Sequence, residues 1–201
     1  MKNPIARQQR DLYATRADFM HRRQILALID RYEQQFPDEH EEVRRIRAFV
    51  QSHEDCFERS LAPGHVTGSA WLLDDNRERV LLTHHRKLDI WVQLGGHADG
   101  EANISLVARK EAQEESGLKD LELLSDQIFD IDIHAIPERG AEPSHYHYDC
   151  RFLFRAAGAQ DYVVSDESHD LAWIPLDKVC DYTTEASIMR MLEKTRQGLI
   201  K

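Results

Sequence analysis

The first sixty residues of the chain place apolar side chains at intervals of three and four positions. In the first stretch, which Pro37 interrupts, these residues are Leu12, Phe19, Ile25, Leu26, Ile29 and Tyr32. In the second stretch, from Asp38 to Ser60, they are Val43, Ile46, Phe49, Val50 and Phe57. This spacing predicts two amphipathic helices. Because neither helix can bury its apolar face alone, we expect them to dock on the rest of the chain, on each other or across a homodimer.

The pattern changes at Leu61, where short apolar and alternating runs between turn residues replace the helical spacing. The predicted strands are Val66–Leu73, Arg79–Thr83, Trp91–Leu94, segments within Leu121–Ile136, Tyr146–Arg155 and Ala172–Leu176. One helix is predicted between a cap at Asn103 and an end at Gly117, and another within residues 185–199. Helices and strands alternate without the regular spacing of parallel units. We therefore predict an α/β fold in residues 61–201, a mixed β-sheet sandwiched between helices, after a helical N-terminal extension over residues 1–60.

Composition and charge narrow the classes of protein to consider. With 41% hydrophobic and 31% charged residues the chain has a soluble globular composition. It contains no apolar run near the roughly 18 residues of a membrane span. The formal net charge of -10 argues against duplex nucleic acid as a partner, because the chain would repel a polyanion. Cys56, Cys150 and Cys180 are odd in number and widely spaced, so we expect buried thiols in a reducing cytoplasm.

The predicted helix after Gly95 and Gly96 carries three glutamates on one face. Glu111 lies three and four positions before Glu114 and Glu115, which brings the carboxylates together. Each like-charge pair at these spacings costs roughly 0.2–0.5 kcal/mol, and the last two glutamates also lie at the unfavourable end of the helix dipole. A hard cation such as Mg2+ would offset this repulsion, because it binds carboxylate oxygens. A solvated acidic face is the alternative, but the fixed spacing and the glycine pair, which we expect to form a tight turn, favour a metal site.

Residues 95–118 resemble the Nudix box, the pattern G-x5-E-x7-R-E-U-x-E-E-x-G-U in which U is a bulky apolar residue. The positions that match are Gly96, Glu111, Glu114, Glu115, Gly117 and Leu118. Two positions depart from the pattern, because Ala102 stands in place of a glutamate and Lys110 in place of an arginine. If the first half of the pattern, G-x5-E-x7-R, is moved one residue towards the N-terminus, it is matched by Gly95, Glu101 and Arg109.

This resemblance implies hydrolysis of a nucleoside diphosphate linked to another group, with Mg2+ or Mn2+ as cofactor. The metal ligands that it implies are Glu111, Glu114, Glu115 and the carbonyl of Gly95. Glu111 would be catalytic, and helix phase favours Lys110 as the cationic partner of the carboxylates, although lysine lacks the bidentate fork of arginine. The family takes its general base from different places, so Glu111 itself, Glu167 and Glu142 are all candidates.

Two other functions remain open. An isopentenyl-diphosphate isomerase-like enzyme would share the fold and a diphosphate substrate, but its chemistry needs a cysteine and a glutamate in the pocket. Cys150 is the cysteine considered for that role. A non-catalytic nucleotide-sensing module would bind its ligand without cutting it, although such a module need not retain three repelling glutamates.

Two further segments carry candidate substrate-binding residues. The stretch around residues 145–155 alternates apolar and polar side chains, so His145, His147 and Asp149 share one face of a strand. This row is interpreted as part of the substrate cleft, as a solvated outer face or as a second, separate metal site. His85 and Arg86 end a predicted strand before the glycine pair, where they would grip a substrate phosphate or form a solvated basic turn.

Overall fold

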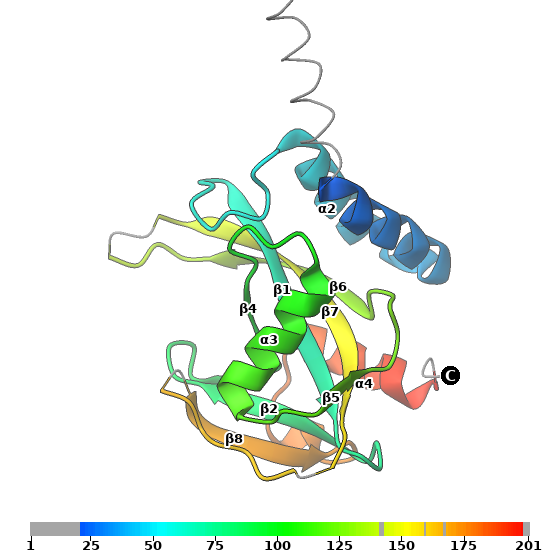
Figure 1. Ribbon diagram of the computed structural model, residues 1–201, viewed down its shortest axis with the longest axis vertical. Helices are drawn as coiled ribbons and strands as arrows, with labels where there is room; N and C mark the ends of the chain where they lie inside the picture. Colours follow the sequence, from blue (N-terminus) through cyan, green and yellow to red (C-terminus); the bar gives the residue numbers. More distant parts are fainter. Residues whose placement is uncertain (1–20, 141–142, 159, 167, 199–201) are drawn as a thin grey trace, which may run out of the picture.

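The computed structural model describes residues 21–140, 143–158, 160–166 and 168–198 of the chain (Figure 1). A helix over residues 21–35 comes first. The elements after it are η1 (Pro37–Glu39), α2 (His40–Ser52), β1 (Gly64–Leu73), β2 (Arg79–His85), β3 (Ile90–Val92), β4 (Leu94–His97), α3 (Ile104–Ser116), β5 (Leu121–Leu123), β6 (Asp130–Ile136), β7 (His145–Ala156), β8 (Ser168–Pro175), η2 (Val179–Asp181) and α4 (Ala186–Arg196).

The strands form one mixed sheet, as predicted. β1 and β7 run parallel, from Gly64 opposite Tyr146 to Leu73 opposite Arg155. The other pairs are antiparallel: β2 and β4 pair with β1, β3 and β8 with β2, and β5 and β6 with β7. Every residue of β1 is buried, so this strand lies at the centre of the fold.

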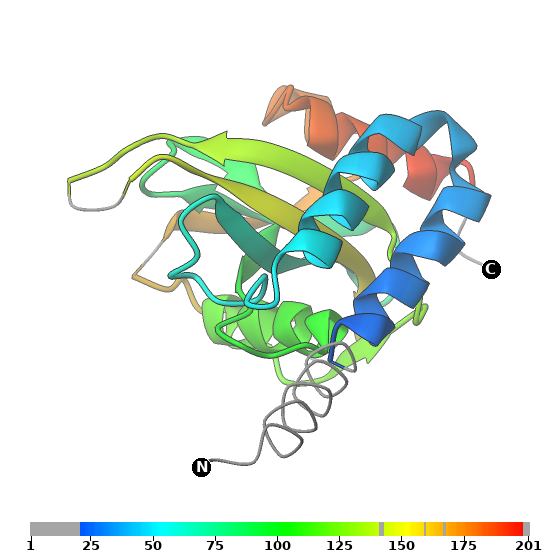
Figure 2. The same cartoon turned by 90° about the horizontal axis from the view of Figure 1, so that it is seen from above.

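Helices cover both faces of the sheet (Figures 1 and 2). Because successive residues of a strand point to opposite faces, β1 contributes to two apolar cores. Ala70 lies in the core on one face with Ile104 of α3, and Trp71 lies in the core on the other face with Ile188 of α4. The predicted arrangement of a sheet between helices is therefore confirmed.

The two N-terminal helices pack into the same core as α3. Their buried apolar residues are Ile25, Leu28, Ile29, Tyr32, Val43, Ile46, Phe49 and Val50. The ring of Phe49 stacks on Tyr148 of β7, with 3.9 Å between the ring centroids. The Tyr32 hydroxyl accepts a hydrogen bond from the Ile131 N–H at 3.2 Å, which covers part of the β6 edge that faces away from β7. Docking on the rest of the chain is thus confirmed for these residues, and a homodimer stays a prediction.

The second N-terminal helix is shorter than the apolar spacing suggests. α2 ends at Ser52, after which the backbone of His53 is extended while its N–H still bonds the Phe49 carbonyl at 3.1 Å. Phe57 is buried, but it lies in turns that lead towards β1. The apolar positions in the first predicted helix that precede residue 21, Leu12 and Phe19, lie outside the described residues.

The cysteines are free thiols in two different environments. Cys56 and Cys150 are buried, as predicted, but Cys180 is exposed in η2, and the prediction is wrong for that residue. Burial raises the pKa of the Cys56 thiol to about 12 and that of Cys150 well above its ordinary value. Within the described ranges, no helix combines the length and the apolar character that a membrane crossing needs.

Candidate functional site

The helix that carries the acidic cluster begins and ends where the sequence predicts. Asn103 precedes α3, and its side-chain oxygen accepts a hydrogen bond from the Leu106 N–H at 3.4 Å. Gly117 follows its last residue with φ at 73°, in the left-handed region that strains any residue with a Cβ. These two ends fix the length of α3 and therefore the position of its glutamates above the sheet.

The three glutamates occupy the C-terminal half of α3, which packs against β1 and β4. Glu111 and Glu115 are half-buried. Glu114 is exposed, and its carboxylate lies 3.6 Å from the ammonium group of Lys110. Of the two basic residues considered from the sequence, Lys110 is the one in contact with this acidic cluster.

The other residues considered for the pattern have different contacts. Arg109 points towards the sheet, with its guanidinium carbon 5.8 Å from the centre of the Phe154 ring. Glu101 accepts a hydrogen bond from the Asn103 N–H at 2.7 Å in the loop before α3. Ala102 packs against the apolar core. Consecutive residues on a helix point in different directions, so a shift of one position cannot bring Arg109 to the place of Lys110.

The glycine pair lies in an extended strand, and the predicted tight turn is wrong. Gly95 and Gly96 belong to β4 and lie opposite Ser69 and Gly68 of β1. A Cβ on Gly96 would lie 2.2 Å from Oε2 of Glu111, and a Cβ on Gly95 would lie 2.2 Å from Oγ of Ser69. Glycine is needed at both positions because other groups approach the backbone closely. Such close approach, rather than a turn, is a common reason for glycine within a strand.

Glu115 is held against this glycine strand. The Gly95 N–H donates a hydrogen bond to Oε1 of Glu115 at 2.9 Å. In an antiparallel ladder the N–H and C=O of one residue point to the same side of the strand, so the Gly95 carbonyl is also directed towards the side of α3. Two carboxylates and a carbonyl on one side make the oxygen donor set that hard divalent cations prefer.

A second group of polar side chains lies on the sheet face opposite α3. Asp149 of β7 accepts hydrogen bonds from Thr67 at 2.9 Å, Ser69 at 2.8 Å and Arg151 at 2.8 Å. Gln93, in the link between β3 and β4, donates a further hydrogen bond to Asp149 at 3.3 Å. Asp149 is only 1% exposed, so the interpretation of its strand face as a solvated surface is wrong at this position.

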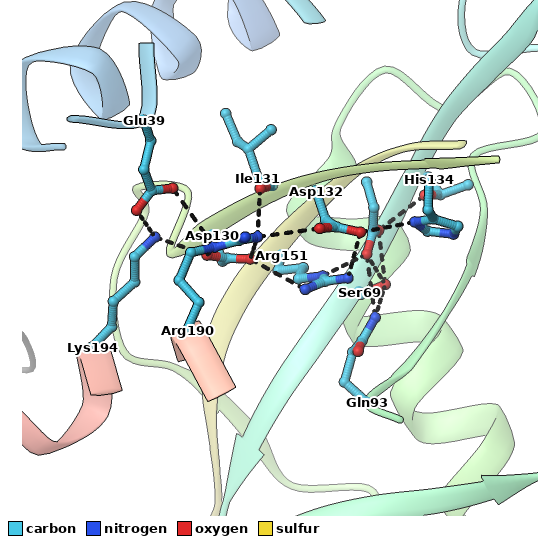
Figure 3. Close-up of polar contacts among 12 residues, drawn as sticks. Glu39, Ser69, Gln93, Asp130, Ile131, Asp132, His134, Arg151, Arg190 and Lys194 are labelled. Carbon is cyan, nitrogen blue, oxygen red and sulfur yellow. Dashed lines mark hydrogen bonds and ion pairs between the residues drawn. The ribbon is translucent and has the colours of Figure 1, made fainter. Parts of the chain in front are cut away.

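This polar row continues into a buried network between the sheet and α4 (Figure 3). The Arg151 guanidinium, which bonds Asp149, also donates to Asp130 of β6 at 3.2 Å. Asp130 is completely buried and accepts hydrogen bonds from Arg190 at 2.7 Å and from Lys194 at 2.8 Å. The network therefore joins β6, β7 and α4 through buried charges of both signs.

Comparison with known proteins assigns the family. Residues 63–193, more than half of the chain, match the sequence model of the NUDIX domain. The chain belongs to the Nudix family. No curated protein sequence matches it.

Solved Nudix structures share its fold. The Ap4A hydrolase of C. elegans, determined as a binary complex, is 15% identical at a TM-score of 0.50, and the likeness covers 67% of this chain and 96% of that one. The dihydroneopterin triphosphate pyrophosphohydrolase of E. coli is 15% identical at a TM-score of 0.50, over 64% of this chain and 92% of that one. At this identity the likeness concerns the fold alone.

In this Nudix domain, Gly96→Ala should displace the carboxylate of Glu111. The added Cβ would meet the end of a flexible side chain, so Glu111 can move while the strand stays in place. We expect the affinity for Mg2+ or Mn2+, measured by calorimetry, to fall by about tenfold or more, since changes to groups that position a metal ligand typically cost about 10–100-fold in metal affinity. The melting temperature in chelator should change little. Unchanged metal affinity would contradict the role given to the close approach of Gly96 and Glu111.

Histidines gather near the start of β1 and β7, on the same face of the Nudix sheet as Asp149. His65 and His147 are register partners in the parallel ladder, and His145 lies two residues before His147. Burial, followed by the charges of neighbouring imidazoles, lowers the pKa of His65 to about 4 and that of His147 to about 2. Both rings are therefore neutral at neutral pH.

Sequence reasoning found only half of this polar face. The β7 half was visible as the alternation of His145, His147 and Asp149. The β1 half has the same alternation, and its members are His65, Thr67 and Ser69. That period-two pattern was a usable signal, but it lies within a segment whose apolar residues already predicted a buried strand.

The basic residues at the end of β2 are engaged in local structure. The ring of His85 accepts a hydrogen bond from the Lys87 N–H at 3.2 Å, within the turn. Arg86 donates to the Ser168 carbonyl of β8 at 3.0 Å. These contacts explain how the turn is held, and a grip on substrate phosphate stays a prediction.

Proposed function

We propose that this Nudix protein is a divalent-cation-dependent hydrolase that cleaves a diphosphate linkage in a nucleoside diphosphate derivative or a similar small molecule. One observation carries the proposal: β4 is built so that Glu111 and Glu115 can lie against its glycines. The two glutamates are four positions apart on α3, where their repulsion opposes stability. A strand that lacks a side chain at Gly96, where Glu111 approaches, and whose Gly95 N–H holds a second repelling carboxylate nearby is explained by a cation site.

The donor set supports Mg2+ or Mn2+ as the cofactor. Glu111, Glu115 and the carbonyl of Gly95 would hold the ion, with Glu114 as a further ligand from the exposed side of α3. When bound, such a cation neutralises phosphate charge and lowers the pKa of an attacking water. The protein has a net charge of -10, so it needs local positive charge to accept an anionic substrate. Lys110 supplies one such charge beside Glu114.

The general base has three candidates in this chain. Glu111 belongs to the described site and would be close to a bound substrate. Glu142 and Glu167 lie outside the described residues. We propose Glu111 as the catalytic carboxylate, with the base among these three to be identified by substitution.

The substrate would lie beside the glycine strand, close to the polar face of β7. Ser69 is the register partner of Gly95, and its hydroxyl donates to Asp149. Asp149 is buried and bonded on several sides, which supports a role in orienting Ser69 and Gln93 rather than direct contact with substrate. We propose His145 and His147 as neighbours of this cleft.

The isomerase alternative is disfavoured by the position of Cys150. Its side chain is completely buried in the core shared with the helices, and burial holds the pKa of its thiol well above the ordinary value. A cysteine in that position cannot reach a substrate. The nucleotide-sensing alternative is left to experiment.

The proposal predicts activity that depends strictly on a divalent cation. The full-length protein, freed of metal with a chelator, should be inert, and added Mg2+ or Mn2+ should restore cleavage. Substrates to assay are a dinucleoside polyphosphate, a nucleotide sugar, a nucleoside triphosphate and isopentenyl diphosphate. Chromatography would separate monophosphate, free phosphate and isomerised products, and calorimetry would detect binding without turnover.

Each outcome of this assay distinguishes one function. Full turnover in excess chelator would refute the metal role. An isomerised product would identify the isomerase, and tight binding of a nucleotide without any product would identify a sensor. Glu122→Gln, an exposed carboxylate on β5, is a matched control that should keep normal turnover.

A further inference from the structure

We propose that His65, His145 and His147 form a second metal site, separate from the carboxylates of α3 and selective for a transition-metal ion such as Zn2+. Their ligand-capable nitrogens all lie within 4.8 Å of one another. The site lies at the start of β1 and β7, on the sheet face opposite α3. It does not depend on the proposed hydrolase activity.

The sheet itself brings these three rings together. His65 and His147 are directly paired in the parallel ladder, and His145 points to the same side as His147 because it is two residues away. The ring centroid of His65 lies 5.0 Å from that of His145 and 4.8 Å from that of His147. His97 of β4 lies beside them, with its ring centroid 5.0 Å from His65 and 5.2 Å from His147. Three imidazoles from two strands thus have their ligand atoms close together, and a fourth ring, from β4, lies beside them.

The closest pair already has the separation of two ligands on one ion. Nε2 of His145 and Nε2 of His147 are 3.3 Å apart. At a zinc–nitrogen distance of about 2.0–2.1 Å, tetrahedral geometry places two nitrogen ligands roughly 3.3 Å from each other. The third ligand, from His65, would approach from within 4.8 Å by small rotations of its side chain.

The tautomer of His145 is the one that metal binding requires. Its Nδ1 lies 2.9 Å from the carbonyl oxygen of Pro143, and because a carbonyl only accepts, Nδ1 must carry the proton. The neutral ring then has a lone pair on Nε2, the atom that faces His147. A backbone carbonyl that fixes the distal nitrogen in this way is the usual support of a histidine ligand.

His65 supplies the independent observation that points to a ligand. Its side chain is 1% exposed, and among the described residues neither ring nitrogen has a hydrogen-bond partner. Buried polar atoms in proteins are nearly always satisfied, and an exception calls for an ion or a water. A metal ion shared with His145 and His147 would satisfy one of these nitrogens.

The chemistry of the donors selects the class of ion. Neutral imidazoles favour Zn2+, Cu2+, Ni2+ and Fe2+, whereas Mg2+ and Mn2+ favour the carboxylates of α3. Zinc in structural sites takes four ligands. His97, whose ring lies beside those of His65 and His147, would supply the fourth by turning its side chain, or a water would occupy that position. Such an ion would tie the ends of β1, β4 and β7 together.

The test is a titration of the full-length, metal-free protein with Zn2+ alone, in a background of excess Mg2+ that occupies the carboxylate site. We expect one Zn2+ per chain in the wild type and in Glu111→Gln/Glu115→Gln, which separates this site from the proposed active site. His145→Ala and His147→Ala should each bind Zn2+ at least tenfold more weakly. His169→Ala, an exposed histidine on β8, should bind as the wild type does.

A second measurement keeps the result decisive if a variant does not fold. Co2+ added to the wild-type protein should show the intense visible absorption of a four-coordinate site, and Zn2+ should abolish it. Weak absorption of a six-coordinate ion in the wild type would overturn the proposal. Equal Zn2+ affinity in the wild type and in a folded His147→Ala would overturn it as well.

Discussion

Replacing Glu115 by glutamine should lower kcat/KM by two or more orders of magnitude and leave the protein at least as stable in chelator. The amide oxygen can still accept the hydrogen bond that the Gly95 N–H donates. The negative charge is lost, so the proposed cation loses an anionic ligand and charge in the transition state is less well stabilised. A hundredfold loss corresponds to about 2.7 kcal/mol, comparable to removing one strong electrostatic contact.

The effect of the same substitution on stability has the opposite sign. Glu115 is the second-last residue of α3, at the negative end of the helix dipole, and it lies four positions after Glu111. Removing its charge relieves both interactions, which together amount to up to roughly 1 kcal/mol. Thermal melts should be run in chelator, because a bound ion stabilises the wild type by itself. A lower melting temperature together with near-normal turnover would show that the Glu115 carboxylate is structural.

Asp130→Asn should be the most destabilising of the changes considered. Asp130 is completely buried and accepts hydrogen bonds from Arg151, Arg190 and Lys194. Without the negative charge of Asp130, the positive charges of these three side chains are less well neutralised in a buried environment. Breaking a buried ion pair in this way typically costs about 3–5 kcal/mol. For a chain of this size we expect the melting temperature to fall by about 6–20 °C.

A matched control and a double variant sharpen this prediction. Glu41→Gln removes a carboxylate of an exposed ion pair on α2 and should leave the melting temperature unchanged. Lys194 also pairs with Glu39 at 2.7 Å, so the network reaches the N-terminal segment. In Asp130→Asn/Lys194→Met the two losses should be less than additive, because both act on one network. Strict additivity, or a shift no larger than that of Glu41→Gln, would refute a cooperative buried network.

Features contained within one short segment could be predicted from the sequence. The spacing of Glu111, Glu114 and Glu115 is a local property of a helix, so it places three carboxylates on one face whatever the rest of the chain does. Asn103 and Gly117 mark the ends of that helix through backbone chemistry that is also local. The same holds for most strands and for the apolar face of α2, although α2 ends at Ser52, earlier than its apolar spacing predicts.

Only the tertiary structure determines which residues from distant segments come into contact and which side chains are buried. Asp149 bonds Thr67 and Ser69 only because β1 and β7 pair in parallel, and no pattern within either strand specifies that register. The same pairing places His65 beside His147 and buries a polar face that alternation alone would leave in solvent. The requirement for glycine at position 96 also comes from tertiary structure. A side chain there would collide with Glu111 of α3, and no turn is involved. Local spacing determines which residues share a face, whereas burial and close approach arise only when separate segments pack against each other.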